Sequence, residues 1–333
     1  MSATPELGTP WRIGPVEVPN RVLLAPLAGI GNWFVRLQAK RYGAGLAVSE
    51  MVSSFAIHHR NEKTMRELLR IHPDERGGGP VSIQLFGHDP DVMRSAAATV
   101  AERGADLIDL NMGCPVPKVC KTGAGAALIK DPDTAVAVAR AAREGSGLPV
   151  TVKLRSGQRP GETDGYELAH RLVHDAGVSA IAFHPRSAAV HHKGTPDYDL
   201  AALLVATLDA PVILTGGLSS AEAVRLGHER TGAAAVMLAR GALGNPWLFA
   251  QVLGTRTAGP TDEEVLAELS WVMDRAVEHL GADRAGRYLR KFYPWYLEQL
   301  HASKELQQAM QATATVADAR TVLAGLQALA AAA

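Results

Sequence analysis

Cysteine is scarce in this chain. The 333 residues include only two cysteines, Cys114 and Cys120, which lie six positions apart. Two cysteines cannot build a disulfide framework, and the adjacent histidines at 58–59 and 191–192 cannot share a helix face as paired metal ligands do. The sequence therefore predicts no metal site, and a reducing compartment for the protein.

The chain also lacks net charge. Its 34 lysines and arginines balance 34 aspartates and glutamates. This balance argues against indiscriminate binding of nucleic acid through bulk charge, while it leaves room for a local basic patch. The first residues show no charged-then-apolar leader, and the Ala-rich stretch 321–333 is too short to span a bilayer. We expect a cytoplasmic monomer with no membrane contact and no protein partner.

What the sequence does contain is a recurring strand–turn–helix pattern between residue 21 and about residue 240. Eight short apolar runs are typical of parallel strands buried on both faces. They cover residues 22–25, 47–50, 81–85, 107–110, 150–154, 180–183, 212–215 and 235–238. Helices are expected between them, for example at 90–102, 133–143, 165–175 and 221–229. Eight such units predict an α/β fold, the TIM (β/α)8 barrel.

Two further features support this interpretation. No strand is followed by a Gly-x-Gly-x-x-Gly fingerprint, which disfavours the alternative of a doubly wound open sheet. After the polar Gly/Pro segment 255–261 no further strand is expected, and leucines and methionines recur at helical spacing. We therefore expect a barrel domain over residues 1–254 and a C-terminal helical domain over residues 255–333.

The carboxyl ends of the predicted strands carry residues that can do chemistry, and barrel active sites lie at that end. Cys114 follows the fourth strand in a turn, where a thiol is available for reaction, although free cysteines are more often small buried hydrophobes. Lys153 lies within an apolar strand, and a buried charge without a partner is costly. His184 ends the sixth strand and can be either a core histidine or a site residue.

A phosphate site is expected where the seventh and eighth strands end. Thr215, Gly216 and Gly217 precede a helix, so backbone N–H groups and the helix dipole can face an anion. Arg240, after the eighth strand, can bind a phosphate with two parallel hydrogen bonds. A tight turn alone would explain the same glycines equally well.

Taken together, these strand ends resemble the tRNA-dihydrouridine synthase family. The resemblance runs from about residue 20 to residue 249. Its most specific part is the cysteine loop, Asn-Met-Gly-Cys-Pro-Val-Pro-Lys at 111–118. The other matching segments are 25–29, 48–51, 123–128, 152–155 and 240–247.

The resemblance implies an FMN enzyme that reduces uridines in tRNA to 5,6-dihydrouridine, with NADPH as electron donor. It implies that Cys114 is the proton donor. The implied FMN contacts are Pro26, Leu27, Ala28, Gln84, Lys153, His184, Thr215, Gly216, Gly217, Ala239 and Arg240. The expected substrate contacts are Asn111, Lys118, Arg155, Arg186, Arg287 and Arg290.

The implied chemistry suits these residue types. Reduced flavin passes a hydride to C6 of uracil, and C5 then needs a proton from the opposite face. An ordinary thiol, with a pKa near 8.5, is still protonated at neutral pH and can supply it. Lys153 and Asn111 can hold developing negative charge by hydrogen bonding. The target base must leave its stack to enter such a site.

A basic stripe in the helical domain is the expected contact with RNA phosphates. Arg284, Arg287, Arg290 and Lys291 recur at helical spacing beside Tyr288. Such a stripe is often only a solvated helix face, but in a chain without net charge it is a plausible phosphate-binding surface.

The sequence also departs from the family pattern in three places. The family usually has Met where Leu27 stands, His-Gly-Arg-Thr-Arg where residues 184–188 stand, and often Asn-Gly-Asp at 215–217. The change at Leu27 is mild, and the other two departures leave open which uridine is modified. Two other functions also stay open: an FMN-dependent reductase of a free pyrimidine, and a non-catalytic protein that binds flavin or RNA.

Overall fold

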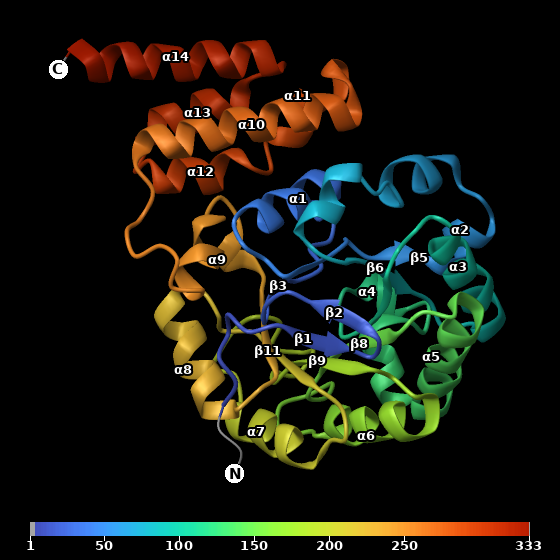
Figure 1. Ribbon diagram of the computed structural model, residues 1–333. Coiled ribbons are helices and arrows are strands. Elements are labelled where there is room, and N and C mark those ends of the chain that lie inside the picture. Colours follow the sequence, from blue (N-terminus) through green and yellow to red (C-terminus); the bar gives the residue numbers. More distant parts are fainter. Residues whose placement is uncertain (1–3, 333) are drawn as a thin grey trace. The chain divides into compact units, whose positions relative to one another are not determined.

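Eight parallel strands form a closed barrel. The computed structural model describes residues 4–332, with side chains up to residue 325. Each barrel strand pairs with the next, and β11 pairs with β3 to close the ring (Figure 1). The strands are β3 (Val22–Leu24), β4 (Leu46–Val48), β6 (Val81–Phe86), β7 (Leu107–Met112), β8 (Val150–Arg155), β9 (Ala180–His184), β10 (Val212–Thr215) and β11 (Ala235–Leu238). The predicted TIM barrel is confirmed, with each strand within two residues of its predicted ends.

A short antiparallel hairpin, absent from the sequence prediction, covers one end of the barrel. It consists of β1 (Trp11–Ile13) and β2 (Val16–Val18). Its apolar side chains share a core cluster with Leu107 and Ala180, the first residues of β7 and β9. The hairpin therefore covers the amino ends of the strands, and the carboxyl ends remain for a site.

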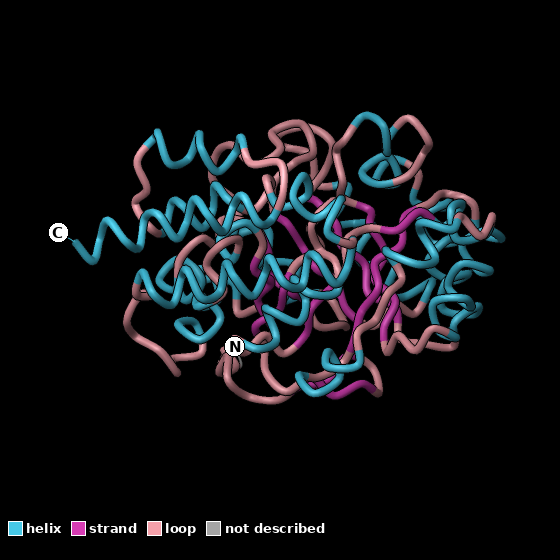
Figure 2. The backbone as a smooth tube through the Cα atoms, turned by 90° about the horizontal axis from the view of Figure 1, so that it is seen from above, coloured by secondary structure: helices cyan, strands magenta, loops and turns pink. Residues whose placement is uncertain are grey.

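Helices lie outside the strands (Figure 1 and Figure 2). The helices up to residue 252 are α1 (Trp33–Arg41), α2 (Ser54–His58), α3 (Pro90–Glu102), α4 (Pro117–Cys120), α5 (Pro132–Ser146), α6 (Asp164–Ala176), α7 (Tyr198–Thr207), α8 (Ala221–Thr231) and α9 (Trp247–Val252). Short turns of other helical types are η1 (Thr64–Leu68), η2 (Pro73–Gly78), η3 (Gly125–Lys130) and η4 (Arg240–Ala242). A two-residue strand, β5 (Val52–Ser53), pairs with the end of β6.

Side-chain caps explain where two predicted helices begin. Asp89 accepts hydrogen bonds from the N–H groups of Asp91 and Val92, and Pro90 occupies the first helical position. Ser220 accepts from the N–H of Ala223 in the same way. Both caps satisfy backbone donors that a helix leaves unpaired, so α3 and α8 start at these residues.

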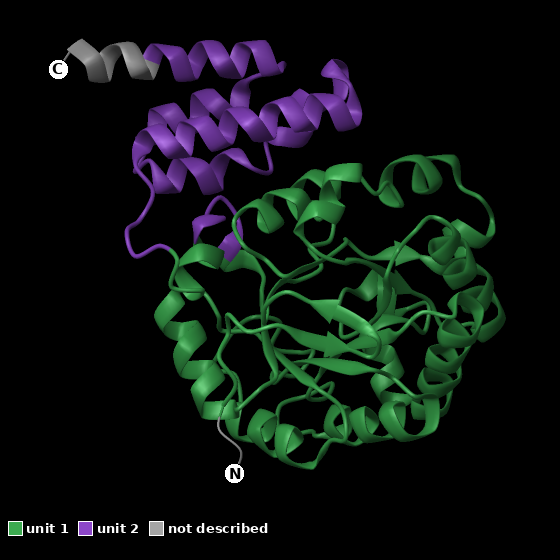
Figure 3. Cartoon of the chain, viewed as in Figure 1, with its two compact units in different colours: residues 1–241, 248–255 green, residues 242–247, 256–333 purple. Residues whose placement is uncertain are grey.

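The chain divides into two compact units, one of residues 1–241 and 248–255 and one of residues 242–247 and 256–333 (Figure 3). The second unit contains α10 (Asp262–Leu280), α11 (Ala282–Leu289), α12 (Tyr293–Gln299), α13 (Lys304–Ala312) and α14 (Val316–Ala332). Thr261 and Glu264 form a reciprocal capping box at the start of α10. None of the helices in the described part of the chain combines the length and apolarity needed to cross a membrane.

Candidate active site

The cysteine loop is held at the carboxyl end of β7 by one amide. The Asn111 Oδ1 atom accepts hydrogen bonds from the N–H of Gly113, at 3.2 Å, and from the N–H of Cys114, at 2.9 Å. The N–H of Ala126 donates to the Cys114 carbonyl at 3.0 Å, and the Cys120 thiol donates to it at 3.3 Å. Cys114 is thus fixed just beyond the strand with its side chain partly exposed, whereas Cys120 supports the loop.

Behind this loop lies a buried carboxylate that sequence reasoning missed. Asp109 accepts a hydrogen bond from the Thr151 hydroxyl at 2.5 Å and one from the Gln84 Nε2 group at 2.6 Å. Burial raises the pKa of Asp109 to about 6, against the pull of these hydrogen bonds and of Lys153. The signal in the sequence was an acidic residue inside an apolar strand.

Lys153 lies beside Asn111, because these two residues are register partners on β8 and β7. Burial, reinforced by the charge of Arg155, lowers the pKa of Lys153 to about 8. The pKa of His184 is lowered as well, first by burial and then by Lys153 and the neighbouring arginines. Near pH 7 the lysine is therefore mostly cationic and the histidine is neutral.

Two of the arginines predicted to bind substrate are engaged within the barrel. Arg155 is buried, and its guanidinium donates to the carbonyls of Gly113 at 3.1 Å, Ser187 at 2.9 Å and His191 at 2.7 Å. Arg186 donates twice to the Gly194 carbonyl, at 3.2 and 2.6 Å. Arg155 thereby joins the loop after β7 to the loop after β9, and Arg186 is held within the loop after β9.

The ends of β10 and β11 are shaped by glycines. Gly216 has a φ of +98°, and a Cβ there would overlap the imidazole of His184. A Cβ on Gly241 would lie 2.9 Å from the Cα of Ser219, so the loops after β10 and β11 touch. Arg240 begins η4 with an exposed side chain. Close packing therefore requires glycine at these positions, and Arg240 places a cation next to the turn that the sequence predicts to bind a phosphate.

The loop after β3 is held by a second acidic residue. The Glu50 carboxylate accepts from the N–H of Gly29 at 2.8 Å, and the Glu50 N–H donates to the Gly31 carbonyl at 2.9 Å. Pro26, Leu27 and Ala28 belong to this loop, and Ala239 directly follows β11, the strand that pairs with β3. These backbone segments therefore lie side by side at the rim of the barrel.

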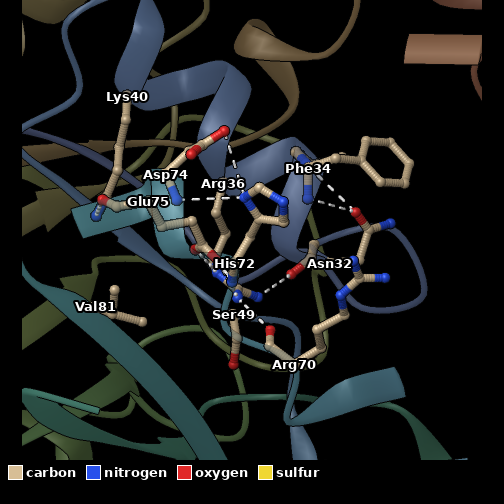
Figure 4. Close-up of polar contacts among 12 residues, drawn as sticks. Asn32, Phe34, Arg36, Lys40, Ser49, Arg70, His72, Asp74, Glu75 and Val81 are labelled. Carbon is tan, nitrogen blue, oxygen red and sulfur yellow. Dashed lines mark hydrogen bonds and ion pairs between the residues drawn. The ribbon is translucent and has the colours of Figure 1, made fainter. Parts of the chain in front are cut away.

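Deeper support for the same loop comes from a buried ion pair (Figure 4). Arg36 contacts both oxygens of Glu75, at 2.7 and 2.9 Å, and donates to the Gly31 carbonyl at 3.3 Å. The Lys40 ammonium donates to the carbonyls of Glu75, Gly79 and Pro80 at 2.6 to 2.9 Å. The segment around η2 is thereby fastened to α1.

In the helical unit, the residues of the predicted basic stripe differ in exposure and in their contacts. Arg284, Arg287 and Lys291 are exposed on and just after α11. Arg290 instead donates to the Thr313 carbonyl at 3.1 and 2.7 Å, which fastens the loop after α13.

In the barrel unit, Lys118 is exposed on α4, close in sequence to Cys114. In the described part of the chain no group of three or more His, Cys, Asp or Glu side chains is arranged to hold a metal.

Comparison with known proteins then identifies the family. Residues 23–333 match the family described as Dihydrouridine synthase (Dus). The tRNA-dihydrouridine synthase B of Pseudomonas aeruginosa is 35% identical over 301 residues, which cover 88% of this chain and 89% of that protein. The chain belongs to the dihydrouridine synthase family. As a member of the dihydrouridine synthases it is a flavin-dependent oxidoreductase.

A second relative belongs to the same family, and solved structures share the fold. The tRNA-dihydrouridine synthase B of Vibrio vulnificus is 35% identical, covering 90% of this chain and 94% of that protein. A morphinone reductase structure in complex with tetrahydroNAD matches with a TM-score of 0.57 and 15% identity, covering 78% of this chain and 94% of that one. A 2-naphthoyl-CoA reductase structure matches with a TM-score of 0.61 and 14% identity, covering 78% of this chain and 53% of that one. The structural matches show that the barrel fold is shared.

Proposed function

We propose that this dihydrouridine synthase reduces uridines in tRNA to 5,6-dihydrouridine, with FMN as its cofactor and NADPH as the electron source. One observation carries the proposal: Cys114 is held at the open end of the barrel, on a loop whose anchoring amide also contacts Gln84. The curated relatives named for this activity on tRNA support the choice of substrate. We also propose that the enzyme acts in the cytoplasm as a monomer.

Residues of six strand ends would hold FMN. The turn at 215–217 and Arg240 would bind its phosphate, and the backbone of 26–28 and Ala239 would line the ring system. Gln84 and Lys153 supply hydrogen-bond donors, and His184, kept neutral, packs over Gly216. When bound, FMN supplies the hydride that uracil accepts at C6.

Cys114 then completes the reaction from the other side of the base. Its thiol gives its proton to C5, and the resulting thiolate regains a proton from water. Lys153, mostly an ammonium near pH 7, stabilises negative charge as it develops, while the Asn111 amide holds the loop that carries Cys114. The base gains one hydride at C6 and one proton at C5, which together give the neutral 5,6-dihydro base.

Contacts with tRNA would come from side chains left exposed by the fold. Lys118 lies next to the cysteine loop, and Arg287 lies on α11 of the helical unit. Arg155, Arg186 and Arg290 would contribute indirectly, because their guanidinium groups already bind carbonyls. Replacing Arg287 with Ala should reduce the salt dependence of tRNA affinity by about one phosphate contact.

The decisive experiment compares the two cysteines. Purified protein with FMN, NADPH and an unmodified tRNA transcript should form dihydrouridine at a defined nucleotide. Cys114→Ala should lower the rate by about 10²-fold or more, as expected for a lost general acid. Cys120→Ala is the matched control and should stay within about threefold of wild type, since that thiol makes only a loop contact.

Other outcomes point to other functions. Turnover of free uracil or orotate without turnover of tRNA would indicate a free-pyrimidine reductase. Binding of FMN and tRNA with no product, in wild type as in Cys114→Ala, would indicate a non-catalytic binding protein. Parallel assays with NADH determine whether NADPH is preferred.

A further inference from the structure

A row of hydrogen bonds runs through the barrel from Asp109 to the cysteine loop. Gln84 on β6 and Asp109 on β7 are register partners, and both side chains are 1% exposed. The Gln84 Nε2 group donates to Asp109 at 2.6 Å. The Asn111 Nδ2 group donates to the Gln84 Oε1 atom at 3.2 Å, and the Asn111 Oδ1 atom accepts from the N–H of Cys114 at 2.9 Å.

Every bond in this row has a required direction. An ionised carboxylate can only accept hydrogen bonds, so Gln84 must turn its Nε2 group toward Asp109. Its Oε1 atom is then left to face Asn111, which must offer Nδ2 in return. Only in that orientation does the Asn111 oxygen point toward the cysteine loop, where it binds two backbone N–H groups.

We propose that Asp109 is a positioning residue whose carboxylate sets the direction of this row and thereby the placement of Cys114. The proposal rests on the proposed function, since that function gives Cys114 and Gln84 their roles. Asp109 itself touches neither substrate nor cofactor in this scheme. It acts through the two amides.

The surroundings of Asp109 support a role beyond packing. The carboxylate is bonded to the neutral groups of Thr151 and Gln84 and is almost fully buried. Keeping a charge there costs stability, because burial disfavours the ionised form. Positions 108 and 110, on either side of it in β7, carry apolar residues of the kind that buried strands favour. The strand thus holds a carboxylate where packing alone would favour a hydrocarbon.

The test uses a readout that needs no enzyme activity. In a Cys120→Ala background, the apoprotein is treated with iodoacetamide and the alkylation rate of Cys114 is measured. Asp109→Leu removes the acceptor that fixes the orientation of the Gln84 amide, and with it that of the Asn111 amide. The alkylation rate of Cys114 should therefore change at least fivefold. The kcat with FMN, NADPH and tRNA should fall by about 10²-fold with KM for tRNA within twofold, as a misplaced catalytic group costs.

Two further variants separate positioning from structural damage. Asp109→Leu combined with Gln84→Leu should be no slower than Gln84→Leu alone, because both act through one row. Ser82→Ala is the matched control: its hydroxyl is buried in β6 and has no hydrogen-bond partner in the described part of the chain, so alkylation and kcat should stay within twofold.

Where Asp109→Leu does not fold, Asp109→Asn replaces it. An amide can turn either way, so a loss of threefold to tenfold is expected.

The outcomes distinguish the two proposals. Wild-type protein that binds no FMN or makes no dihydrouridine overturns the proposed function. An unchanged alkylation rate in Asp109→Leu, effects that multiply in the double variant, or an Asp109→Asn protein identical to wild type overturns the positioning role of Asp109.

Discussion

The barrel unit contains two buried clusters of charge that are built differently. Around Glu75, the carboxylate meets the Arg36 guanidinium directly through both oxygens and also accepts the N–H of His72. Around Asp109, the hydrogen-bond donors are the neutral side chains of Thr151 and Gln84, and the pKa of the carboxyl rises to about 6.

This difference separates charges that hold the fold from charges that serve the site. A buried carboxylate bonded to a guanidinium at two points has its charge compensated directly by its partner, and the pair fastens the two segments that supply it. A buried carboxylate whose hydrogen-bond donors are neutral is not compensated for its desolvation, so its pKa rises. The pKa of Asp109 is about 6 and that of Lys153 is about 8, both close to pH 7. Such values mark groups that can respond to chemistry nearby.

The largest expected effect comes from breaking the first cluster. Arg36→Met leaves Glu75 buried and without its cation, which should lower the free energy of unfolding by about 3–5 kcal/mol. Urea denaturation measures it. Arg171→Met, which removes exposed pairs with Asp133 and Asp175, is the control and should cost less than about 1 kcal/mol. Equal losses in both variants would contradict the distinction.

The second prediction concerns the pH dependence of stability at Asp109. Its folded-state pKa of about 6 exceeds the ordinary 3.8, so the folded protein binds this proton more tightly than the unfolded chain. The resulting stability is present below about pH 4 and is lost as pH rises through 6, a change of about 3 kcal/mol. The difference in unfolding free energy between wild type and Asp109→Asn should decline over that range. A difference independent of pH would show that Asp109 has an ordinary pKa.

The smallest effect comes from comparing two lysines. Burial lowers the pKa of Lys40 and of Lys153 to about 8 in each case. Lys40→Met leaves three carbonyls without their shared donor and should cost about 1–3 kcal/mol. Lys153→Met removes a poorly solvated charge at the barrel mouth and should change thermal stability by less than about 1 kcal/mol, in either direction. A loss of stability larger than this in Lys153→Met would show that Lys153, like Lys40, mainly stabilises the fold.

The sequence predicts the barrel well because its strands are continuous apolar runs, whose buried faces leave little ambiguity. It misses the β1–β2 hairpin because each strand has only three residues, too few to establish an alternating pattern. Cys114 and Lys153 could be placed at the strand ends by position alone. The role of Arg155 could not, because its three carbonyl partners lie 32 to 42 residues away along the chain.

Asp109 was missed for a related reason. Residues at the ends of barrel strands can be recognised as ligand-facing from their position alone. Asp109 lies within β7 and contacts other protein groups, so its position gives no such signal. Its importance depends on which atom of each neighbouring amide points toward it. That information exists only once three strands are in register.

The three carbonyls bound by Arg155 have a consequence for altering specificity. One guanidinium joins the loop after β7, which carries the cysteine, to the loop after β9, which contains Ser187 and His191. Any replacement in the segment 185–197 that moves the Ser187 or His191 carbonyl will therefore also shift the loop that carries Cys114. Under the proposed function, substrate contacts made by this segment and the position of the proposed proton donor must be redesigned together.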